Sequence, residues 1–240
     1  MTPRSLISAL LICFLTIAQA AAEPLKILFI GNSYTGGIKN AVTQLIKQSP
    51  HADTELVFIN PGGKTLEFHL ANQATLKRIK TGNFDFVVLQ DQSQFPAVHP
   101  ERFDKAARQL DKLIDASGAK TVFYQTWGRR DGDAMNLQKF PDYASMQQAL
   151  SKSYRSTAKN CSALLAPVGD TWASIRKSNP KLGRELYRKD GSHPSAKGAY
   201  LAACVFYQTL FKQPASQSKF KGKLTPEEQK LILKATTSTR

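Results

Sequence analysis

Two short runs of the sequence are apolar almost throughout. Leu25–Ile30 reads LKILFI and Phe84–Leu89 reads FDFVVL, and neither alternates between apolar and polar residues. Strands that are covered on both faces have this composition, and they occur in parallel sheets packed between two layers of helices. These runs therefore restrict the chain to the α/β class more strongly than any other feature of the sequence.

The rest of the sequence alternates between strand-like and helix-like segments. Further strands are predicted at Glu55–Asn60, Lys120–Thr126 and Ala163–Val168. Helices are predicted between and after the strands, at Val42–Lys47, Leu66–Ile79, Phe103–Ala116, Tyr143–Ala158, Ala196–Phe211 and Pro226–Lys234. Strands joined by helical crossovers pair in parallel with right-handed connections. We therefore predict an α/β fold, a three-layer α/β/α sandwich around a central, mostly parallel five-stranded sheet of the flavodoxin-like kind.

The N-terminus has the three parts of a secretory signal peptide. Arg4 supplies positive charge, Leu6–Ile17 is an apolar run, and Ala18-Gln19-Ala20 offers small residues for cleavage after Ala20. A membrane span needs about 20 apolar residues, so an uncleaved anchor fits this shorter run less well. We expect residues 1–20 to be a signal peptide and residues 21–240 to form one domain with a peripheral tail after about residue 212. The protein is then secreted or periplasmic, with no stable membrane span after cleavage.

The sequence is strongly basic. Its formal net charge is +15 at pH 7, and Arg4 is the one charged residue of the predicted signal peptide. This charge favours an anionic polymer or an envelope surface as a partner, although a merely solvated basic surface has the same composition. The sequence shows no signature of a DNA- or RNA-binding module, so we expect no nucleic-acid partner.

Nothing in the sequence calls for a metal or another cofactor, and none is expected. Cys161 and Cys204 remain after the predicted cleavage, and their spacing resembles no metal site. Either a disulfide or two separate buried thiols fits their apolar surroundings. The sequence also lacks a His-Glu-x-x-His motif and closely spaced acidic residues.

Four residues with chemical potential each follow a predicted strand. They are Ser33, Gly63, Gln92 and Trp127. In open parallel sheets, ligands bind beyond the carboxyl ends of the strands. We therefore expect these four residues to gather on one edge of the sheet.

Ser33 needs a base to become a nucleophile, and histidine is the usual base near neutral pH. Among the histidines, His193 has a carboxylate beside it in a short turn, Asp190-Gly191-Ser192-His193. A carboxylate three residues earlier can accept the Nδ1–H of the imidazole and leave Nε2 free to act as the base. The alternative is a solvated turn, because Asp-x-x-His alone is a weak signal. Ser33 also lacks the Gly-x-Ser-x-Gly elbow of α/β-hydrolases.

Taken together, these pieces resemble the SGNH (GDSL-like) hydrolase superfamily over nearly all of the chain after residue 20. Gly-Asn-Ser follows the first strand, a glycine turn follows the second, an amide-bearing turn follows the third, and Asp-x-x-His lies near the C-terminus. The resemblance implies that Ser33 is the nucleophile, that His193 is the general base and that Asp190 orients the imidazole. It also implies that the backbone N–H groups of Ser33 and Gly63 belong to an oxyanion hole.

Two blocks depart from the family pattern. Asn32 stands where the name-giving motif has aspartate, and the third block is Leu89-Gln90-Asp91-Gln92-Ser93 instead of Gly-x-Asn-Asp. Counting from the end of the strand places Gln92 where the family has the asparagine that completes the oxyanion hole. The Gln92 amide offers the same N–H₂ donor, and Gln90 is the alternative. The sequence is similar to a divergent branch of the superfamily with GNSYT and VVLQ-x-QS blocks.

The candidate substrate-binding residues are Asn32, Gln90, Trp127 and Arg129. An aromatic plane on the active edge suits a sugar face, and a guanidinium suits a carboxylate or phosphate. The alternative is that Trp127 fills the end of the sheet while the arginine faces water.

We therefore expect an exported serine esterase that hydrolyses small acyl esters, acetyl above all, on a carbohydrate or glycan through Ser33, His193 and Asp190. A lipase or thioesterase of the same fold is one alternative. A non-catalytic protein that binds an envelope surface or anionic polymer is another, since a fold can be reused without its chemistry. The sequence does not specify the acyl length.

Overall fold

Five parallel strands form the central sheet of the described chain. The computed structural model describes residues 24–239, so the predicted signal peptide lies outside the described residues. The strands are β1 (Lys26–Ile30), β2 (Glu55–Ile59), β3 (Phe86–Leu89), β4 (Lys120–Tyr124) and β5 (Leu164–Ala166). They pair in the order β2-β1-β3-β4-β5, and every pairing is parallel. The predicted α/β class and the flavodoxin-like strand order are confirmed.

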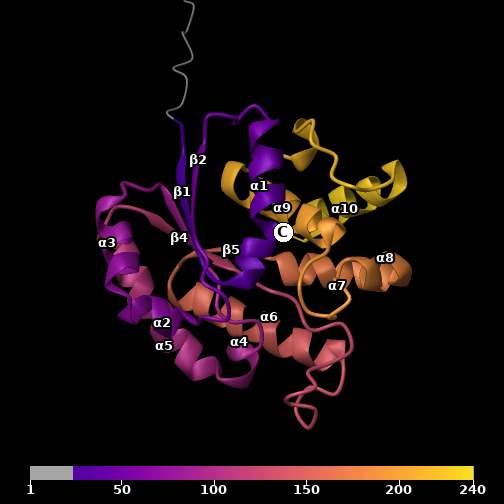
Figure 1. The fold of residues 1–240 in the computed structure, drawn as a ribbon, viewed down its shortest axis with the longest axis horizontal. Helices are drawn as coiled ribbons and strands as arrows, with labels where there is room; N and C mark the ends of the chain where they lie inside the picture. Colours follow the sequence, from indigo (N-terminus) through magenta and orange to yellow (C-terminus); the bar gives the residue numbers. More distant parts are fainter. Residues whose placement is uncertain (1–23, 240) are drawn as a thin grey trace, which may run out of the picture.

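Helices cover both faces of this sheet (Figure 1). One layer contains α1 (Ser33–Lys47), α7 (Val168–Ser178), α8 (Pro180–Glu185), α9 (Ala196–Phe211) and α10 (Pro226–Ser238). The other contains α2 (Leu66–Ala71), α3 (Gln73–Thr81), α4 (Phe95–Val98), α5 (Pro100–Asp115) and α6 (Tyr143–Asn160). Alternate residues of β1 face the two layers, as the pleat of a strand requires, so that Ile27 and Ile30 belong to different cores. None of the helices within residues 24–239 combines the length and apolar character that crossing a membrane requires.

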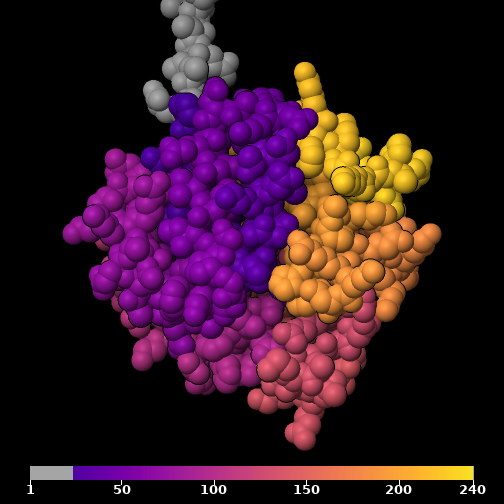
Figure 2. Space-filling view, in the orientation of Figure 1, coloured from indigo at the N-terminus to yellow at the C-terminus, as the bar shows by residue number. Residues whose placement is uncertain are grey.

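Helix α9 packs against both the first helix of the described chain, α1, and the last, α10. Its sequence is apolar nearly all round, and a helix of this kind needs cover on every side. The sheet, α1 and α10 supply that cover. Figure 2 shows the consequence on the surface, where the indigo N-terminal segment lies directly against the orange and yellow C-terminal segments.

Two predicted segments differ in the structure. The helix predicted at Leu66–Ile79 is two helices, because the side chain of Asn72 accepts a hydrogen bond from Thr75 N at 2.9 Å and starts α3 anew. The segment after about residue 212 is not peripheral. Ile232 and Ala235 of α10 are buried in the same core as α9, so this tail is part of the packed fold.

The two cysteines of the described chain are separate thiols. Cys204 is buried on α9, whereas Cys161 follows α6 in the other layer and is partly exposed. Burial raises the pKa of each thiol to about 12, so both stay protonated at neutral pH. The structure therefore selects the two-thiol alternative over the disulfide.

The first three strands end level with one another. Ile30 of β1 pairs with Ile59 of β2 and Leu89 of β3. The residues that follow these strands consequently share one edge of the sheet. This is the edge where the sequence places its candidate chemical groups.

Candidate active site

Ser33 is the first residue of α1 and follows the buried turn after β1. Asn32 caps this helix, because its Oδ1 accepts a hydrogen bond from Tyr34 N at 3.1 Å. Its Nδ2 donates to Lys64 O at 2.9 Å, which ties the turn to the loop after β2. An aspartate could cap the helix but lacks that second, donating group. The residue that departs from the family motif therefore has a structural role here.

Gly31, directly after β1, has no room for a side chain because Thr35 and Gln90 occupy that space. The Oε1 of Gln90 accepts hydrogen bonds from Asn32 N at 3.0 Å and from Thr35 Oγ1 at 2.8 Å. A Cβ atom on Gly31 would lie only 2.5 Å from that same Oε1. Glycine at this position thus allows Gln90 to hold the turn that presents Ser33.

Gln90 is therefore a supporting residue and not a substrate-binding one, contrary to the prediction. It is 0% exposed, and its N–H₂ group donates to Asp91 O. It does not line the cavity beside Ser33, whereas Gln92 does. Its burial also makes it the weaker of the two candidates for the oxyanion donor.

His69 supports the same turn from the other side. It is fully buried, and its Nε2 lies 2.9 Å from Gly31 O. Because a carbonyl oxygen only accepts, Nε2 carries the hydrogen and donates. Burial lowers the pKa of His69, which keeps the ring neutral. Nothing in the sequence pointed to this bond.

The structure brings Ser33, His193 and Asp190 together. His193 Nε2 lies 2.9 Å from Ser33 Oγ, and His193 Nδ1 lies 2.7 Å from Asp190 Oδ2. Ser33 comes from the start of the chain and the other two from near its end. This is the arrangement that the family resemblance implies, on the predicted edge of the sheet.

Asp190 also organises the turn that carries the histidine. Its Oδ1 accepts hydrogen bonds from Ser192 N at 2.9 Å and His193 N at 3.0 Å. Burial acts to raise the pKa of this carboxyl, but the bonds from Ser192 and His193 outweigh it and hold the pKa below its ordinary value. Asp190 is therefore ionised at neutral pH and keeps the Nδ1–H of His193 bound.

Arg188 holds the far end of this turn, which the sequence did not indicate. Its backbone N–H donates to His193 O at 2.8 Å, and its Nε–H donates to Pro194 O at 3.0 Å. The carbonyls on either side of the His193–Pro194 bond are thus fixed by a single residue. The imidazole is consequently restrained from both the carboxylate side and the carbonyl side.

An aromatic stack packs behind the histidine. Tyr34 lies edge-on to the His193 ring at 5.3 Å, and its hydroxyl lies 2.7 Å from Ser192 Oγ. Trp127 stacks on Tyr34 at 4.9 Å and on Trp172 at 4.0 Å, measured between ring centroids. Burial raises the pKa of Tyr34, so its hydroxyl remains protonated beside the turn.

Trp127 has no free face for a sugar. It is 0% exposed, both faces of its indole are covered, and its Nε1–H donates to Ser192 O at 3.0 Å. The prediction that this residue binds substrate by stacking is therefore wrong, and the alternative that it fills the end of the sheet is right. The aromatic ring supports the histidine turn instead.

A cavity of about 210 Å³ lies over the serine. Its lining residues come from the turns after the strands and from the histidine turn: Asn32, Ser33, Tyr34, Gly63, Gln92, Ser93, Arg129, Ser192 and His193. All three predicted oxyanion residues and the predicted base therefore border a single space. That space is small.

Three donors face this cavity region without a partner. Gly63 has a φ of +69°, a left-handed conformation that favours glycine. Within residues 24–239, neither its N–H nor that of Ser33 has a hydrogen-bond partner. Gln92 Oε1 accepts from Gln94 N at 3.0 Å and Phe95 N at 3.1 Å, so the Gln92 N–H₂ group is the free end of its amide. This anchoring by the start of α4 is not visible in the sequence.

Arg129 lines the cavity and is held in place by a buried carboxylate. Its Nη1 donates to Asp133 Oδ1 at 2.7 Å, and Asp133 is 0% exposed. Asp133 also accepts from Met135 N and from Asn136 Nδ2, so it organises the loop that borders the site. Arg129 is thus a fixed lining residue of the cavity, and its role in binding substrate stays a prediction.

Asp91 is a buried carboxyl directly before Gln92. Gln92 N donates to its Oδ1 at 2.6 Å, whereas Oδ2 has no hydrogen-bond partner in the described chain. Burial raises the pKa of Asp91 from its ordinary 3.8 to about 7. The two acids of the site region, Asp91 and Asp190, therefore have pKa values shifted in opposite directions.

No group of three or more His, Cys, Asp or Glu side chains within residues 24–239 has the arrangement of a metal site.

The comparisons with known proteins point to a hydrolase family. The sequence matches no family model and no curated protein. Among solved structures, a protein from Slackia heliotrinireducens described as an SGNH hydrolase is 30% identical, with a TM-score of 0.66, over 78% of this chain and 98% of its own. The chain belongs to the SGNH hydrolase superfamily.

Two further structures resemble this SGNH hydrolase at lower identity. A DUF4886 family protein from Bacteroides uniformis is 18% identical, with a TM-score of 0.71, over 89% of this chain and 93% of its own. An acetyl xylan esterase is 18% identical, with a TM-score of 0.60, over 78% of this chain and 100% of its own. At such identities the likeness establishes the fold alone.

Proposed function

We propose that this SGNH hydrolase is an exported serine esterase that removes small acyl groups, acetyl above all, from a carbohydrate or glycan. The observation that carries the proposal is the continuous chain of hydrogen bonds from Ser33 through His193 to Asp190. A serine hydroxyl becomes nucleophilic when an adjacent base takes its proton and a third group orients that base. Export rests on the signal-peptide pattern of residues 1–20.

The reaction proceeds in two halves. Ser33 Oγ attacks the ester carbonyl carbon while its proton passes to His193 Nε2. The tetrahedral intermediate collapses, the ester C–O bond breaks, and His193 returns the proton to the departing alcohol. Water then attacks the acyl-serine with His193 again as the base, which releases the acid and restores the hydroxyl. Asp190 stabilises the imidazolium in both halves without taking its proton.

The three unpartnered donors stabilise the oxyanion. The N–H groups of Ser33 and Gly63 and the N–H₂ group of Gln92 border the cavity above Ser33. Donors already in place for the developing charge require no reorganisation during the reaction. Gln92 is our preferred third donor because Gln90 is buried within the turn.

The size of the cavity supports a small acyl group. A volume of about 210 Å³ accommodates an acetyl group better than a long acyl chain. One protein of the same fold is an acetyl xylan esterase, which supports acetylated carbohydrate as the substrate class. Arg129 beside the cavity would suit an acidic group near the ester.

The proposal is tested by replacing the nucleophile. Ser33→Ala should lower kcat/KM for p-nitrophenyl acetate by about a thousandfold or more, because a serine hydrolase without its nucleophile retains little catalysis. A serine-directed fluorophosphonate should label the wild-type protein and not the variant. Ser156→Ala, at an exposed position on α6, is the matched control and should change neither result.

The same measurements separate the alternatives. Retained hydrolysis in Ser33→Ala would refute the assignment of the nucleophile. A folded wild-type protein that neither hydrolyses the ester nor reacts with the probe would favour the non-catalytic binding protein. A kcat/KM that rises with acyl length from acetate to octanoate would favour the lipase or thioesterase reading.

A further inference from the structure

A second hollow lies beside the catalytic cavity. It has a volume of about 350 Å³ and is bordered by α1, the start of α9 and the loop before α10. Pro194, which directly follows His193, lines it, as does Gly37, which lies one helical turn after Ser33. A Cβ on Gly37 would lie 2.8 Å from Pro194 Cγ, so these two residues touch. We call this hollow the α1–α9 groove.

The lining of the α1–α9 groove is cationic. Arg188 and Lys223 line it, and no Asp or Glu does. Both residues are exposed, and neither forms an ion pair within residues 24–239. Arg188 uses its Nε–H on Pro194 O, which leaves its two terminal N–H₂ groups without a partner in the described chain. A guanidinium held in this way presents two parallel donors, the geometry that recognises a carboxylate or phosphate.

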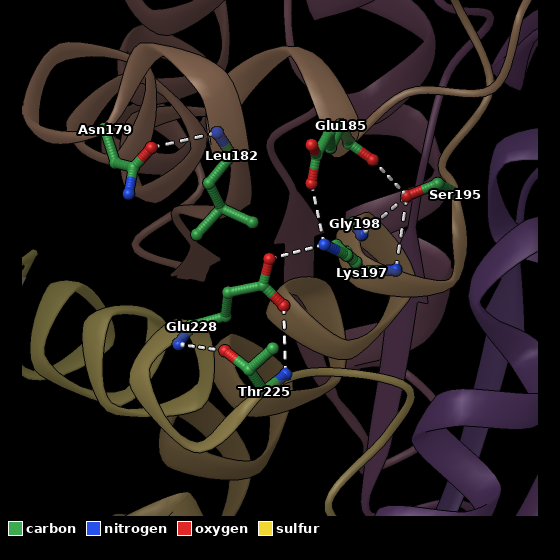
Figure 3. A network of polar contacts seen from close by, with 8 residues as sticks. All are labelled: Asn179, Leu182, Glu185, Ser195, Lys197, Gly198, Thr225 and Glu228. Atoms are coloured by element: carbon green, nitrogen blue, oxygen red, sulfur yellow. Dashed lines mark hydrogen bonds and ion pairs between the residues drawn. The ribbon is translucent and has the colours of Figure 1, made fainter.

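The charge of a nearby lysine, Lys197, is by contrast neutralised by carboxylates of the protein itself. Figure 3 shows Lys197 of α9 between the carboxylates of Glu185 and Glu228, with Nζ lying 2.7 Å from Glu185 Oε2. The other oxygen of Glu228 accepts from Thr225 N and caps α10. These two acids are therefore committed to Lys197 and to the cap. The charges of Arg188 and Lys223 remain for another partner.

The groove is built before any ligand arrives. The loop that carries Lys223 is fixed to α1, because Ser218 Oγ donates to Leu45 O at 2.7 Å and Lys219 N donates to Gln48 O at 2.9 Å. Ser218 is 2% exposed, so this attachment is internal. Preformed walls reduce the ordering that binding must otherwise supply.

The proposed reaction indicates which part of an ester substrate would lie toward the α1–α9 groove. His193 protonates the leaving alcohol, so the alcohol part of the ester departs past the imidazole, whereas the carbonyl faces Gly63 and Gln92. The groove begins on the histidine side of the site, at Pro194, the residue after His193. Resting on the function proposed above, we propose that the α1–α9 groove binds an anionic group, a carboxylate or phosphate, on the alcohol part of the substrate. The enzyme then prefers acyl esters of acidic carbohydrates to those of neutral ones.

Lys223→Gln tests the groove with a matched pair of substrates. Acetylated oligogalacturonides carry carboxylates, and acetylated xylooligosaccharides of the same length do not. The variant should raise KM for the acidic substrate about three- to fivefold, as the loss of one exposed ionic contact predicts, and should raise it distinctly less for the neutral one. Added salt should reduce the wild-type preference, because the contact is solvent-exposed.

Lys105→Gln is the control, since it removes the same charge from an exposed position on α5 in the opposite helix layer. It should leave both KM values unchanged. A preference that Lys105→Gln reduces as much as Lys223→Gln would assign it to net charge and overturn the groove. Equal KM values for the two substrates in the wild-type protein would overturn it as well.

A binding measurement separates failure of the groove from failure of the proposed function. Calorimetry of the Ser33→Ala protein with unacetylated tetragalacturonate and with glucose 6-phosphate needs no catalysis. Binding of either probe that weakens in Ser33→Ala/Lys223→Gln supports the groove, and the stronger probe identifies the anion. Absence of binding to both overturns it, even where the wild-type protein hydrolyses p-nitrophenyl acetate.

Discussion

Ser33 and His193, the proposed nucleophile and base, are held in two different ways. The turn that presents Ser33 is fixed from inside the protein by Gln90 and His69, both of which are 0% exposed. The turn that presents the base lies at the surface, where the side chains of His193 and Asp190 are 32% and 47% exposed. The first turn depends on residues far away in the sequence, whereas the second is bonded largely within residues 187–194.

Because of this difference, the buried Ser33 turn should contribute mainly to the stability of the fold, and the exposed His193 turn mainly to the chemistry. Removing a buried hydrogen-bond partner leaves unsatisfied groups in the interior and weakens the whole fold. An exposed carboxylate can change its chemistry at little cost to stability, because water replaces the lost bonds. Substitutions in the two turns should therefore have distinguishable effects.

The largest effect is expected in the exposed turn. Asp190→Asn should lower kcat for p-nitrophenyl acetate by about three orders of magnitude, because an amide N–H₂ facing Nδ1 favours the wrong tautomer of His193. The free energy of unfolding in urea should change by less than about 1 kcal/mol. A loss of stability greater than about 2 kcal/mol would show that this turn is structurally coupled in the same way as the buried one.

The next largest effect is expected in the buried turn. Gln90→Leu removes the acceptor for Asn32 N and Thr35 Oγ1, so the free energy of unfolding should fall by about 3 kcal/mol. Activity should be lost together with the turn geometry. Gln148→Leu, at an exposed position on α6, is the matched control and should change stability by less than about 0.5 kcal/mol. Equal stabilities for the two variants would contradict the comparison.

The effect that is smallest per pH unit concerns the pH dependence of stability. The pKa of Asp91 is about 7 in the folded state against an ordinary value of 3.8, so the folded state binds more protons between about pH 4 and pH 7. Stability from this group is therefore lost as pH rises through that interval, with a slope of up to about 1.4 kcal/mol per pH unit, and the penalty is complete above pH 7.

Asp91→Asn tests this dependence. The variant lacks the titration, so its stability relative to the wild-type protein should increase from pH 4.5 to pH 8 in urea unfolding experiments. Asp190, whose pKa is lowered, should not contribute a dependence of this sign. Parallel stability profiles for the variant and the wild-type protein would show that Asp91 is not titrating in this range.

The strands could be predicted from the sequence because local patterns carry that information, whereas the meeting of Ser33 with His193 was implied by the resemblance to the family. An apolar run specifies a covered strand, and a parallel sheet brings the ends of its strands to one edge. The break at Asn72 also had a local signal, since asparagine is a strong helix N-cap. A single helix was nevertheless predicted, because apolar residues continue with helical spacing on both sides of Asn72.

The supporting residues could not be predicted because their roles depend on distant contacts. A glutamine side chain can line a cavity or be buried in the interior, and its residue type does not distinguish the two. Gln90 is buried because it packs against Gly31, a contact that the sequence does not reveal. Trp127 follows a strand at the expected edge, but Tyr34 and Trp172, which cover its faces, come from other parts of the chain. His69 reaches Gly31 O across 38 residues of sequence.

The aromatic stack gives this protein a built-in optical reporter. The chain has two tryptophans, and both are in the stack that packs behind the histidine turn. All of its tryptophan emission therefore originates in one place, next to the His193 imidazole. Loosening of that turn by a variant, a ligand or denaturant can be followed by fluorescence without attaching a dye.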